Sequence, residues 1–153
     1  QRRTWWQPRK RGNNMINVYI DGSSKGNPGP GGAGIVIYQD NAIFSMHGIG
    51  LGHVTNNQAE FLALKHVLTE LKEQSLADSP ITILSDSTLV VGVFSQNWKA
   101  RANLELVMEV KEILKDFPNA TFSHIRGHNG IQGNELADSL AQEAAERQKG
   151  TKG

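Results

Sequence analysis

The chain has 153 residues, of which 38% are hydrophobic and 20% are charged, and it contains no cysteine. This length is sufficient for one domain with its own hydrophobic core. The lack of cysteine excludes disulfides, thiolate metal sites and thiol nucleophiles. The sequence shows no signal peptide and no hydrophobic run near the ~20 residues of a membrane span, so we expect no membrane association.

Charge is distributed unevenly along the chain. Residues 1–14 carry five basic residues and no acidic one, which leaves 11 basic and 15 acidic residues and a net charge of −4 in the remainder. We predict a basic flexible N-terminal arm or linker over residues 1–14, one domain over 15–148 and a disordered tail over 149–153. The arm is either a solvated linker or a basic segment whose Trp5 and Trp6 stack on bases or sugars.

The first half of the domain is predicted to contain three strands and a helix. Ile16, Val18 and Ile20 alternate with more polar residues, which predicts a strand over 16–21. Strands over 33–39 and 42–51, separated by a turn at residues 40–41, complete an antiparallel meander. A long helix over 55–74 begins with a capping box formed by Thr55 and Gln58.

The second half alternates between strands and helices. The predicted elements are a strand over 81–86, a short helix over 87–97, a helix over 103–115, a strand over 121–127 and a helix over 133–148. Antiparallel strands followed by crossover connections predict an α/β protein, with a mixed sheet and helices packed on it.

The segment between the first two strands is unusually rich in glycine and proline. Residues 22–34 include six glycines and two prolines, more than a hairpin turn requires. We interpret this segment as a turn whose backbone a ligand approaches closely.

Four acidic residues lie where secondary structure predicts inward-facing positions. Asp21 and Asp86 each end a strand, and ligands of open α/β sheets bind at the carboxyl ends of strands. Glu60 lies on the apolar side of its helix. Asp138 lies near the start of the last helix, on the same side as Ala141.

Carboxylates held close together repel one another unless a cation compensates their charge. Hard oxygen ligands without cysteine indicate Mg²⁺ or Mn²⁺ rather than zinc. Two such ions about 4 Å apart could hold both the attacking water and the leaving oxygen of a phosphodiester. The residues alone therefore predict phosphoryl transfer that depends on a divalent metal.

Four motifs occur in order along the chain: DGSSKGNPGPGGAG, TNNQAE, LSDS and RGHNGIQGNELAD. Together they resemble type 1 ribonuclease H over residues 15–148. The resemblance implies the ribonuclease H-like fold, with a five-stranded mixed sheet in the order 3-2-1-4-5 and helices on both faces. It also implies an endoribonuclease that hydrolyses the RNA strand of RNA–DNA hybrids by two-metal-ion catalysis, leaving 5′-phosphate and 3′-hydroxyl ends.

The resemblance also assigns catalytic roles to residues of this chain. The family's four metal-binding carboxylates correspond to Asp21, Glu60, Asp86 and Asp138, which would hold two Mg²⁺ ions, with Mn²⁺ as a substitute. His128 matches a loop histidine that would assist proton transfer or product departure.

Substrate contacts are implied in the same way. Ser24 and Gly26 match positions that approach the RNA minor groove, where 2′-hydroxyls distinguish RNA from DNA, and the neighbouring Asn27 would lie near the DNA strand. The remaining expected contacts, at two helix starts, are Thr55, Asn56, Asn57 and Thr88. Asn56 and Asn57 would bridge the strands, and Thr55 with Asn57 could hold a DNA phosphate. Thr88 replaces the Gln of many family members.

The segment after residue 95 lacks the basic protrusion found in some bacterial members, with only Lys99 and Arg101 before the next helix. The resemblance is therefore to the handle-less branch, which includes cellular enzymes and the ribonuclease H domains of reverse transcriptases. We expect a monomeric cytoplasmic enzyme. Whether the full-length protein has an additional N-terminal domain is left open. The alternatives are a reverse transcriptase domain, another nuclease of the superfamily such as an integrase or transposase, and a catalytically silent hybrid-binding module.

Overall fold

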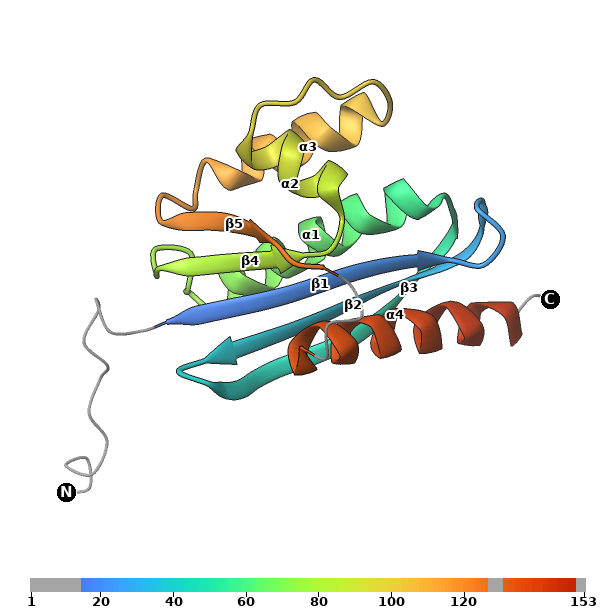
Figure 1. Ribbon diagram of the computed structural model, residues 1–153, viewed down its shortest axis with the longest axis horizontal. Helices are drawn as coiled ribbons and strands as arrows, with labels where there is room; N and C mark the ends of the chain where they lie inside the picture. The colour runs from blue at the N-terminus through green and yellow to red at the C-terminus, as the bar shows by residue number, and fades with distance from the viewer. Residues whose placement is uncertain (1–14, 127–130, 151–153) are drawn as a thin grey trace.

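The computed structural model describes residues 15–126 and 131–150. Its five strands are β1 (Ile16–Ser24), β2 (Gly29–Gln39), β3 (Ala42–Val54), β4 (Ile81–Ser85) and β5 (Ala120–His124). They form a single sheet in the order β3-β2-β1-β4-β5 (Figure 1), which confirms the predicted order. The pairs β1–β2 and β2–β3 are antiparallel, whereas β1–β4 and β4–β5 are parallel.

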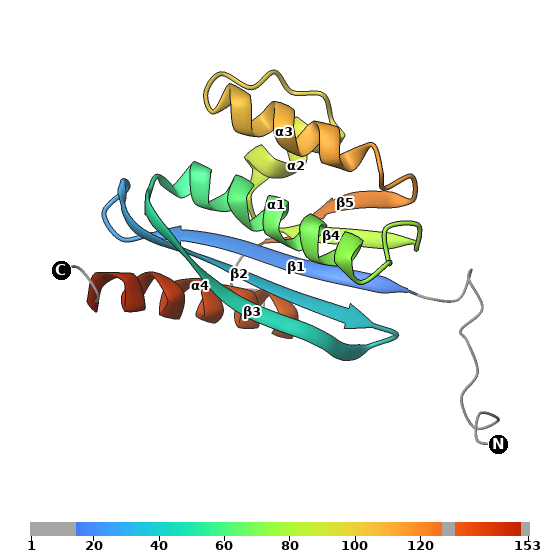
Figure 2. The ribbon, with the colours of Figure 1, turned by 180° about the vertical axis from the view of Figure 1, so that it is seen from behind.

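Helices cover both faces of the sheet, as predicted. The four helices are α1 (Asn56–Glu73), α2 (Thr88–Ser95), α3 (Leu104–Leu114) and α4 (Gln132–Gly150). Helix α4 packs across β1, β2 and β3 on one face, and α1 packs on the opposite face, together with α2 and α3 (Figures 1 and 2). Of the helices in the described ranges, none is long and apolar enough to cross a membrane.

Helix α1 begins where the capping box predicted. The Gln58 N–H donates to the Thr55 side-chain oxygen at 3.1 Å, and the Thr55 N–H donates to Gln58 Oε1 at 2.8 Å. These bonds satisfy two backbone groups near the start of the helix. Its apolar side is buried against the sheet and consists of Phe61, Leu64, Val67, Leu68 and Leu71. The cap and this packing fix the direction in which α1 leaves β3.

The glycine-rich segment is mostly strand, so the predicted start of the second strand at residue 33 is wrong. A Cβ on Gly34 would lie 1.9 Å from the Ala137 carbonyl oxygen, and one on Gly32 would lie 2.2 Å from the Ala141 carbonyl oxygen. Glycine is required at both positions because the α4 backbone rests directly on β2. Helix packing, rather than ligand approach, explains these glycines.

Other element ends differ from the predictions by a few residues. Strand β5 ends at His124 rather than at 127, although the Ile125 N–H still donates to the Ser85 carbonyl at 2.9 Å. Helix α2 begins one residue later than predicted because Ser87 is its N-cap, with Ser87 Oγ accepting from the Val90 N–H at 3.1 Å, and it ends at Ser95 rather than at 97. Helix α4 extends to Gly150, past the predicted domain end at 148.

Candidate active site

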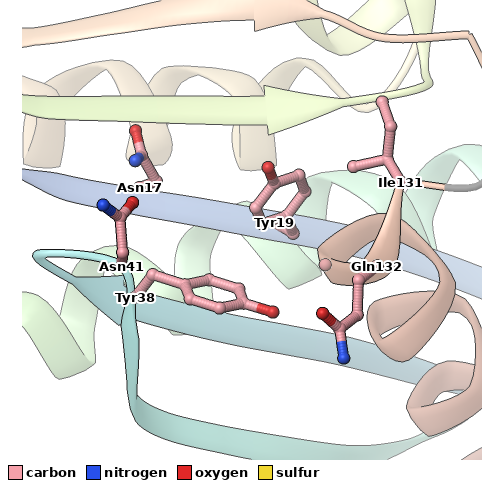
Figure 3. A pocket seen from close by; sticks show the side chains of 7 residues that line it. Asn17, Tyr19, Tyr38, Asn41, Ile131 and Gln132 are labelled. Carbon is pink, nitrogen blue, oxygen red and sulfur yellow. The ribbon is translucent and has the colours of Figure 1, made fainter.

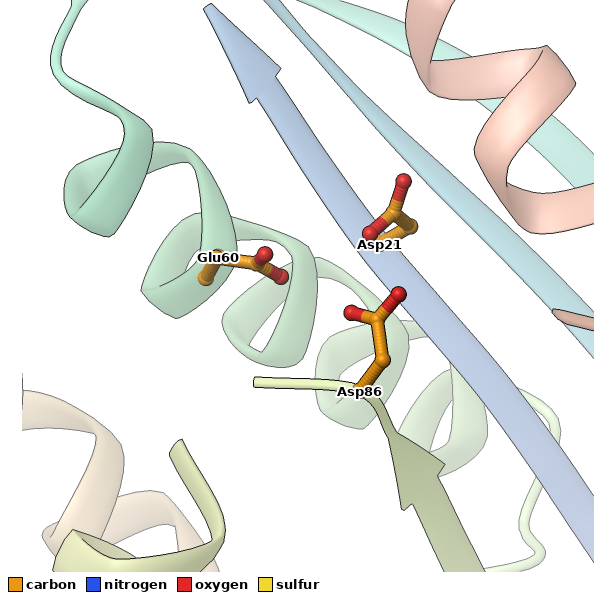
Figure 4. A group of neighbouring side chains, drawn as sticks. All are labelled: Asp21, Glu60 and Asp86. Carbon is orange, nitrogen blue, oxygen red and sulfur yellow. The ribbon is translucent and has the colours of Figure 1, made fainter. Parts of the chain in front are cut away.

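Three of the four predicted carboxylates converge where β4 ends beside β1. Strand β1 continues to Ser24, so the prediction that Asp21 ends its strand is wrong, whereas Asp86 directly follows β4 as predicted. One oxygen from each of Asp21, Glu60 and Asp86 can be chosen so that all three lie within 4.8 Å of one another. Figure 4 shows the three side chains, from β1, α1 and the end of β4, turned toward the same point. Asp21 is the most deeply placed, with 6% of its surface exposed.

Sheet register brings two of these carboxylates together. Ile20 of β1 pairs with Ser85 of β4 in parallel register, so the residues that follow them, Asp21 within β1 and Asp86 just after β4, lie side by side. Ser85 is buried, and its Oγ accepts from the Ser87 N–H at 3.0 Å, which turns the chain away immediately after Asp86. Register and turn together fix the separation of the two acids.

Glu60 reaches the same point from the side of α1. Its Oε1 accepts a hydrogen bond from the Gly22 N–H at 3.1 Å. Glu60 lies between Ala59 and Phe61, both buried, so its side chain leaves the helix next to the core. The predicted inward orientation of Glu60 is confirmed.

Asp138 approaches from the opposite side of the sheet, on α4. Its carboxyl group is close enough to that of Asp21 to raise the pKa of Asp21. Gln142, one turn further along the helix, donates from Nε2 to Asp138 Oδ1 at 3.3 Å. The fourth carboxylate is therefore adjacent to the other three, although it lies outside the tighter group of three oxygens.

Crowding and burial strongly perturb these acids. Burial raises the pKa of Asp21 to about 10, with further increases from the charges of Glu60, Asp86 and Asp138. Burial also raises the pKa of Glu60 to about 8, together with the charge of Asp86 and against the Gly22 hydrogen bond, which lowers it. The pKa of Asp86 is raised by burial and by the charge of Asp138. The ionised site thus carries strong internal repulsion.

The donor set fits a divalent cation. Within the described ranges, no lysine or arginine forms an ion pair with any of the four carboxylates. Carboxylate oxygens are the ligands that Mg²⁺ and Mn²⁺ prefer, and a cation among them would offset the repulsion that raises their pKa values. Asp21, Glu60, Asp86 and Asp138 are the residues that would hold it.

The predicted substrate residues meet where the β1–β2 turn touches the start of α1. The Ser24 N–H donates to Asn56 Oδ1 at 3.0 Å, and the Asn56 N–H donates to Asn27 Oδ1 at 2.8 Å. Ser24 Oγ donates to the Val54 carbonyl at 2.7 Å. Gly26 has a φ of 109°, a conformation that favours glycine. These contacts join the turn and the helix start into one surface.

The other expected contacts are placed less closely. Asn57 is exposed beside a cavity that Trp98, Lys99 and Arg101 also line. Thr88 is exposed at the first position of α2. His128 lies outside the described residues.

Known proteins resemble this chain over most of its length. The family model for RNase H matches residues 13–146. Ribonuclease HI of Helicobacter pylori is 40% identical over 147 residues, covering 89% of this chain and 97% of the relative. Ribonuclease H of Polynucleobacter asymbioticus is 36% identical over 144 residues, covering 86% and 90%. The chain belongs to the RNase H family.

Solved structures of the family agree with this assignment. RNase H1 of Halobacterium salinarum superposes with a TM-score of 0.78 at 32% identity, covering 87% of this chain and 98% of that chain. LC11-RNase H1, solved in complex with an RNA/DNA hybrid, superposes with a TM-score of 0.77 at 30% identity, covering 86% and 97%.

Sequence reasoning missed several neighbours of the site in this RNase H family member. Gln142 donates a hydrogen bond to Asp138, and Lys25 donates to Gln142 Oε1 at 3.2 Å. The charge of His124 lowers the pKa of Asp86. His124 was recoverable in principle, because β5 pairs with β4 and places it opposite Ser85. Gln142 follows Asp138 by one helical turn, but nothing in the sequence distinguishes it from a surface glutamine.

A separate hollow of about 210 Å³ lies further back along β1, on the α4 side. Its lining side chains come from β1, the β2–β3 hairpin and the start of α4 (Figure 3): Asn17, Tyr19, Tyr38, Asn41, Ile131 and Gln132. None of them is charged. This hollow is therefore distinct from the acidic centre, although Tyr19 precedes Asp21 by only two residues.

Proposed function

We propose that this protein is an endoribonuclease that hydrolyses the RNA strand of RNA–DNA hybrids. The observation that carries the proposal is the convergence of Asp21, Glu60 and Asp86 within 4.8 Å, in a chain of the RNase H family. The structure of LC11-RNase H1 in complex with an RNA/DNA hybrid supports the substrate class.

The four carboxylates are proposed to bind two Mg²⁺ ions. Ions bound there would supply activation of the attacking water and stabilisation of the departing 3′ oxygen, which gives 5′-phosphate and 3′-hydroxyl ends. The protein's own contribution is placement. The charges of Asp86 and Asp138 both act on the Asp21 carboxyl group, so Asp21 would help to hold both ions. His128 is proposed to assist proton transfer or product departure.

The surface formed by the β1–β2 turn and the start of α1 is proposed to distinguish the RNA strand of the hybrid from the DNA strand. The Ser24 hydroxyl proton is committed to Val54, so its oxygen is left to accept from a 2′-hydroxyl of the RNA. The Asn27 and Asn56 side-chain oxygens are likewise used within the protein, which leaves their NH₂ groups to donate to the substrate. Small rigid groups of this kind suit a shallow minor groove. Gly26, Thr55, Asn57 and Thr88 complete the proposed contact surface.

One assay tests the proposal. A labelled RNA–DNA hybrid, duplex DNA and duplex RNA are each incubated with the protein and Mg²⁺, with and without chelator. We expect cleavage of the RNA strand of the hybrid alone, abolished by chelator and by Asp86→Asn. Cleavage of duplex DNA would instead indicate another nuclease of the superfamily. Binding of the hybrid without cleavage would indicate a silent hybrid-binding module.

A further inference from the structure

Asn134 carries the one buried side-chain polar atom in the described ranges that has no hydrogen-bond partner, its Oδ1. The residue is 4% exposed and lies in the first turns of α4. It precedes Asp138 by four residues, so the two side chains lie on the same side of the helix, one turn apart. An unpaired oxygen therefore lies one turn from a proposed metal ligand.

Two contacts fix where Asn134 sits over the sheet. The residue before it, Gly133, rests on Tyr19, since a Cβ there would be 2.4 Å from the Tyr19 ring. Ala137, nearly one turn later, rests on Gly34, which pairs with Asp21 across β1 and β2. Figure 3 shows the start of α4 beside Tyr19. Asn134 is thus held over the short stretch of β1 that leads from Tyr19 to Asp21.

A buried carbonyl oxygen without a donor costs free energy, and native proteins usually satisfy such a group with protein or water. The neighbouring groups cannot satisfy this one when they are ionised, because carboxylates only accept hydrogen bonds. Since no group of the described residues donates to this oxygen, a water is the donor that we consider. A divalent cation bound at the carboxylates supplies such donors, because Mg²⁺ usually keeps several of its waters.

We propose that Asn134 is a positioning residue for the divalent cation, with Oδ1 accepting a hydrogen bond from a water that hydrates the ion. This inference rests on the proposed function only in assuming that the ion binds at Asp21 and Asp138. It assigns Asn134 no contact with the RNA or the DNA. The amide then orients the ion's hydration shell from the α4 side, opposite Glu60.

The test separates metal binding from folding. Asn134→Leu removes the oxygen while keeping a similar volume, Asn134→Ala removes it without adding bulk, and Asn134→Asp keeps an acceptor. Each full-length variant is titrated with Mg²⁺ by calorimetry in the absence of nucleic acid. Each is also unfolded with urea in the presence of chelator.

We expect Asn134→Leu and Asn134→Ala to raise the Mg²⁺ dissociation constant about 10- to 100-fold, the usual effect of losing a group that orients a metal's ligands. Asn134→Asp should bind Mg²⁺ at least as tightly as the wild type. In chelator, Asn134→Leu should be as stable as the wild type or more stable, because the unpaired buried oxygen is gone.

A matched control lies on the same helix. Gln148 Oε1 accepts from the Gly52 N–H at 2.7 Å, so its oxygen already has a partner within the protein. Gln148→Leu should lower stability in chelator and leave the Mg²⁺ dissociation constant unchanged, the reverse of Asn134→Leu. An unchanged dissociation constant for both Asn134→Leu and Asn134→Ala would overturn the proposal. A wild-type protein that binds no Mg²⁺ would instead refute the proposed function on which it rests.

Discussion

The backbone N–H of Gly22 donates a hydrogen bond to the Glu60 carboxylate at 3.1 Å. Gly22 directly follows Asp21, so this bond ties the acid of α1 to the acid of β1. The approach is very close, because a Cβ on Gly22 would lie 2.3 Å from the carbonyl carbon of Ala59. The spacing of the two carboxylates therefore depends on the absence of a side chain at residue 22.

Gly22→Ala should disrupt the active site as well as the fold. The added methyl group must push α1 away from β1, at a cost of about 1–3 kcal/mol of unfolding free energy. Glu60 would move with the helix, so Mg²⁺ affinity should fall too. Urea unfolding and Mg²⁺ calorimetry measure the two effects. Gly52→Ala is the control, since its added methyl meets open space and only its φ of 76° is strained. Unchanged Mg²⁺ affinity in Gly22→Ala would contradict this role.

The stability of the metal-free protein should fall as pH rises. The pKa of Asp21 is about 10 and that of Glu60 about 8 in the fold, against ordinary values of 3.8 and 4.5. The folded protein therefore holds these protons more tightly than the unfolded chain does. The resulting stabilisation is complete below about pH 4 and is lost as pH rises toward the folded values, by at most about 1.4 kcal/mol per pH unit for each proton.

Urea unfolding between about pH 5 and about pH 8, in chelator and in Mg²⁺, measures this dependence. Mg²⁺ should reduce the slope, because the cation stabilises the ionised carboxylates. Asp21→Asn should flatten the slope in chelator and raise stability near neutral pH, while abolishing cleavage. Stability that rises with pH in chelator would be the opposite of this expectation.

Gln142→Leu should weaken the site through Asp138. Gln142 accepts from Lys25 Nζ at 3.2 Å and donates to Asp138 Oδ1 at 3.3 Å, so it links the β1–β2 turn to the fourth carboxylate. Its loss should raise the Mg²⁺ dissociation constant by about tenfold or less, since the bond is exposed. Steady-state kinetics should show the effect mainly in kcat. Lys25→Met removes only the hydrogen bond from Lys25 to Gln142, so it should lower kcat less than Gln142→Leu does. An equal loss of kcat would contradict the proposal that Gln142 acts directly on Asp138 and Lys25 acts only through Gln142.

Deletion of residues 1–14 should weaken substrate binding. These residues carry five basic side chains, whereas the rest of the chain has a net charge of −4 although its proposed substrate is a polyanion. Phosphate contacts provide much of the affinity for nucleic acid and make it dependent on salt. The deletion should raise KM and reduce the slope of log KM against log salt by ~0.7–0.9 for each phosphate that the arm neutralises. Identical kinetics across a salt series would show that the arm does not contact the hybrid.

Sequence patterns predicted the elements that depend on local signals. Alternating residues in β1 and the capping box of α1 act over a few neighbours, so they can be read without knowing the fold. The carboxylates could be found because an acid that follows an apolar strand pattern or lies on an apolar helix side is costly to bury without a partner. The ends of β1, β3 and β5 and the start of β2 could not be placed this way, since pairing with neighbouring strands determines how far each strand extends.

The sequence by itself determined the order of the elements, the cap of α1 and the identity of the four acids, because each leaves a mark within a few residues. Only the tertiary structure decided what the glycines of β2 are for, since Gly32 and Gly34 matter through a helix more than 100 residues away in the chain. The same holds for the unpaired oxygen of Asn134 and the link from Lys25 through Gln142 to Asp138. Close packing and hydrogen bonds between distant segments exist only after the chain has folded, and they set the spacing on which the site depends.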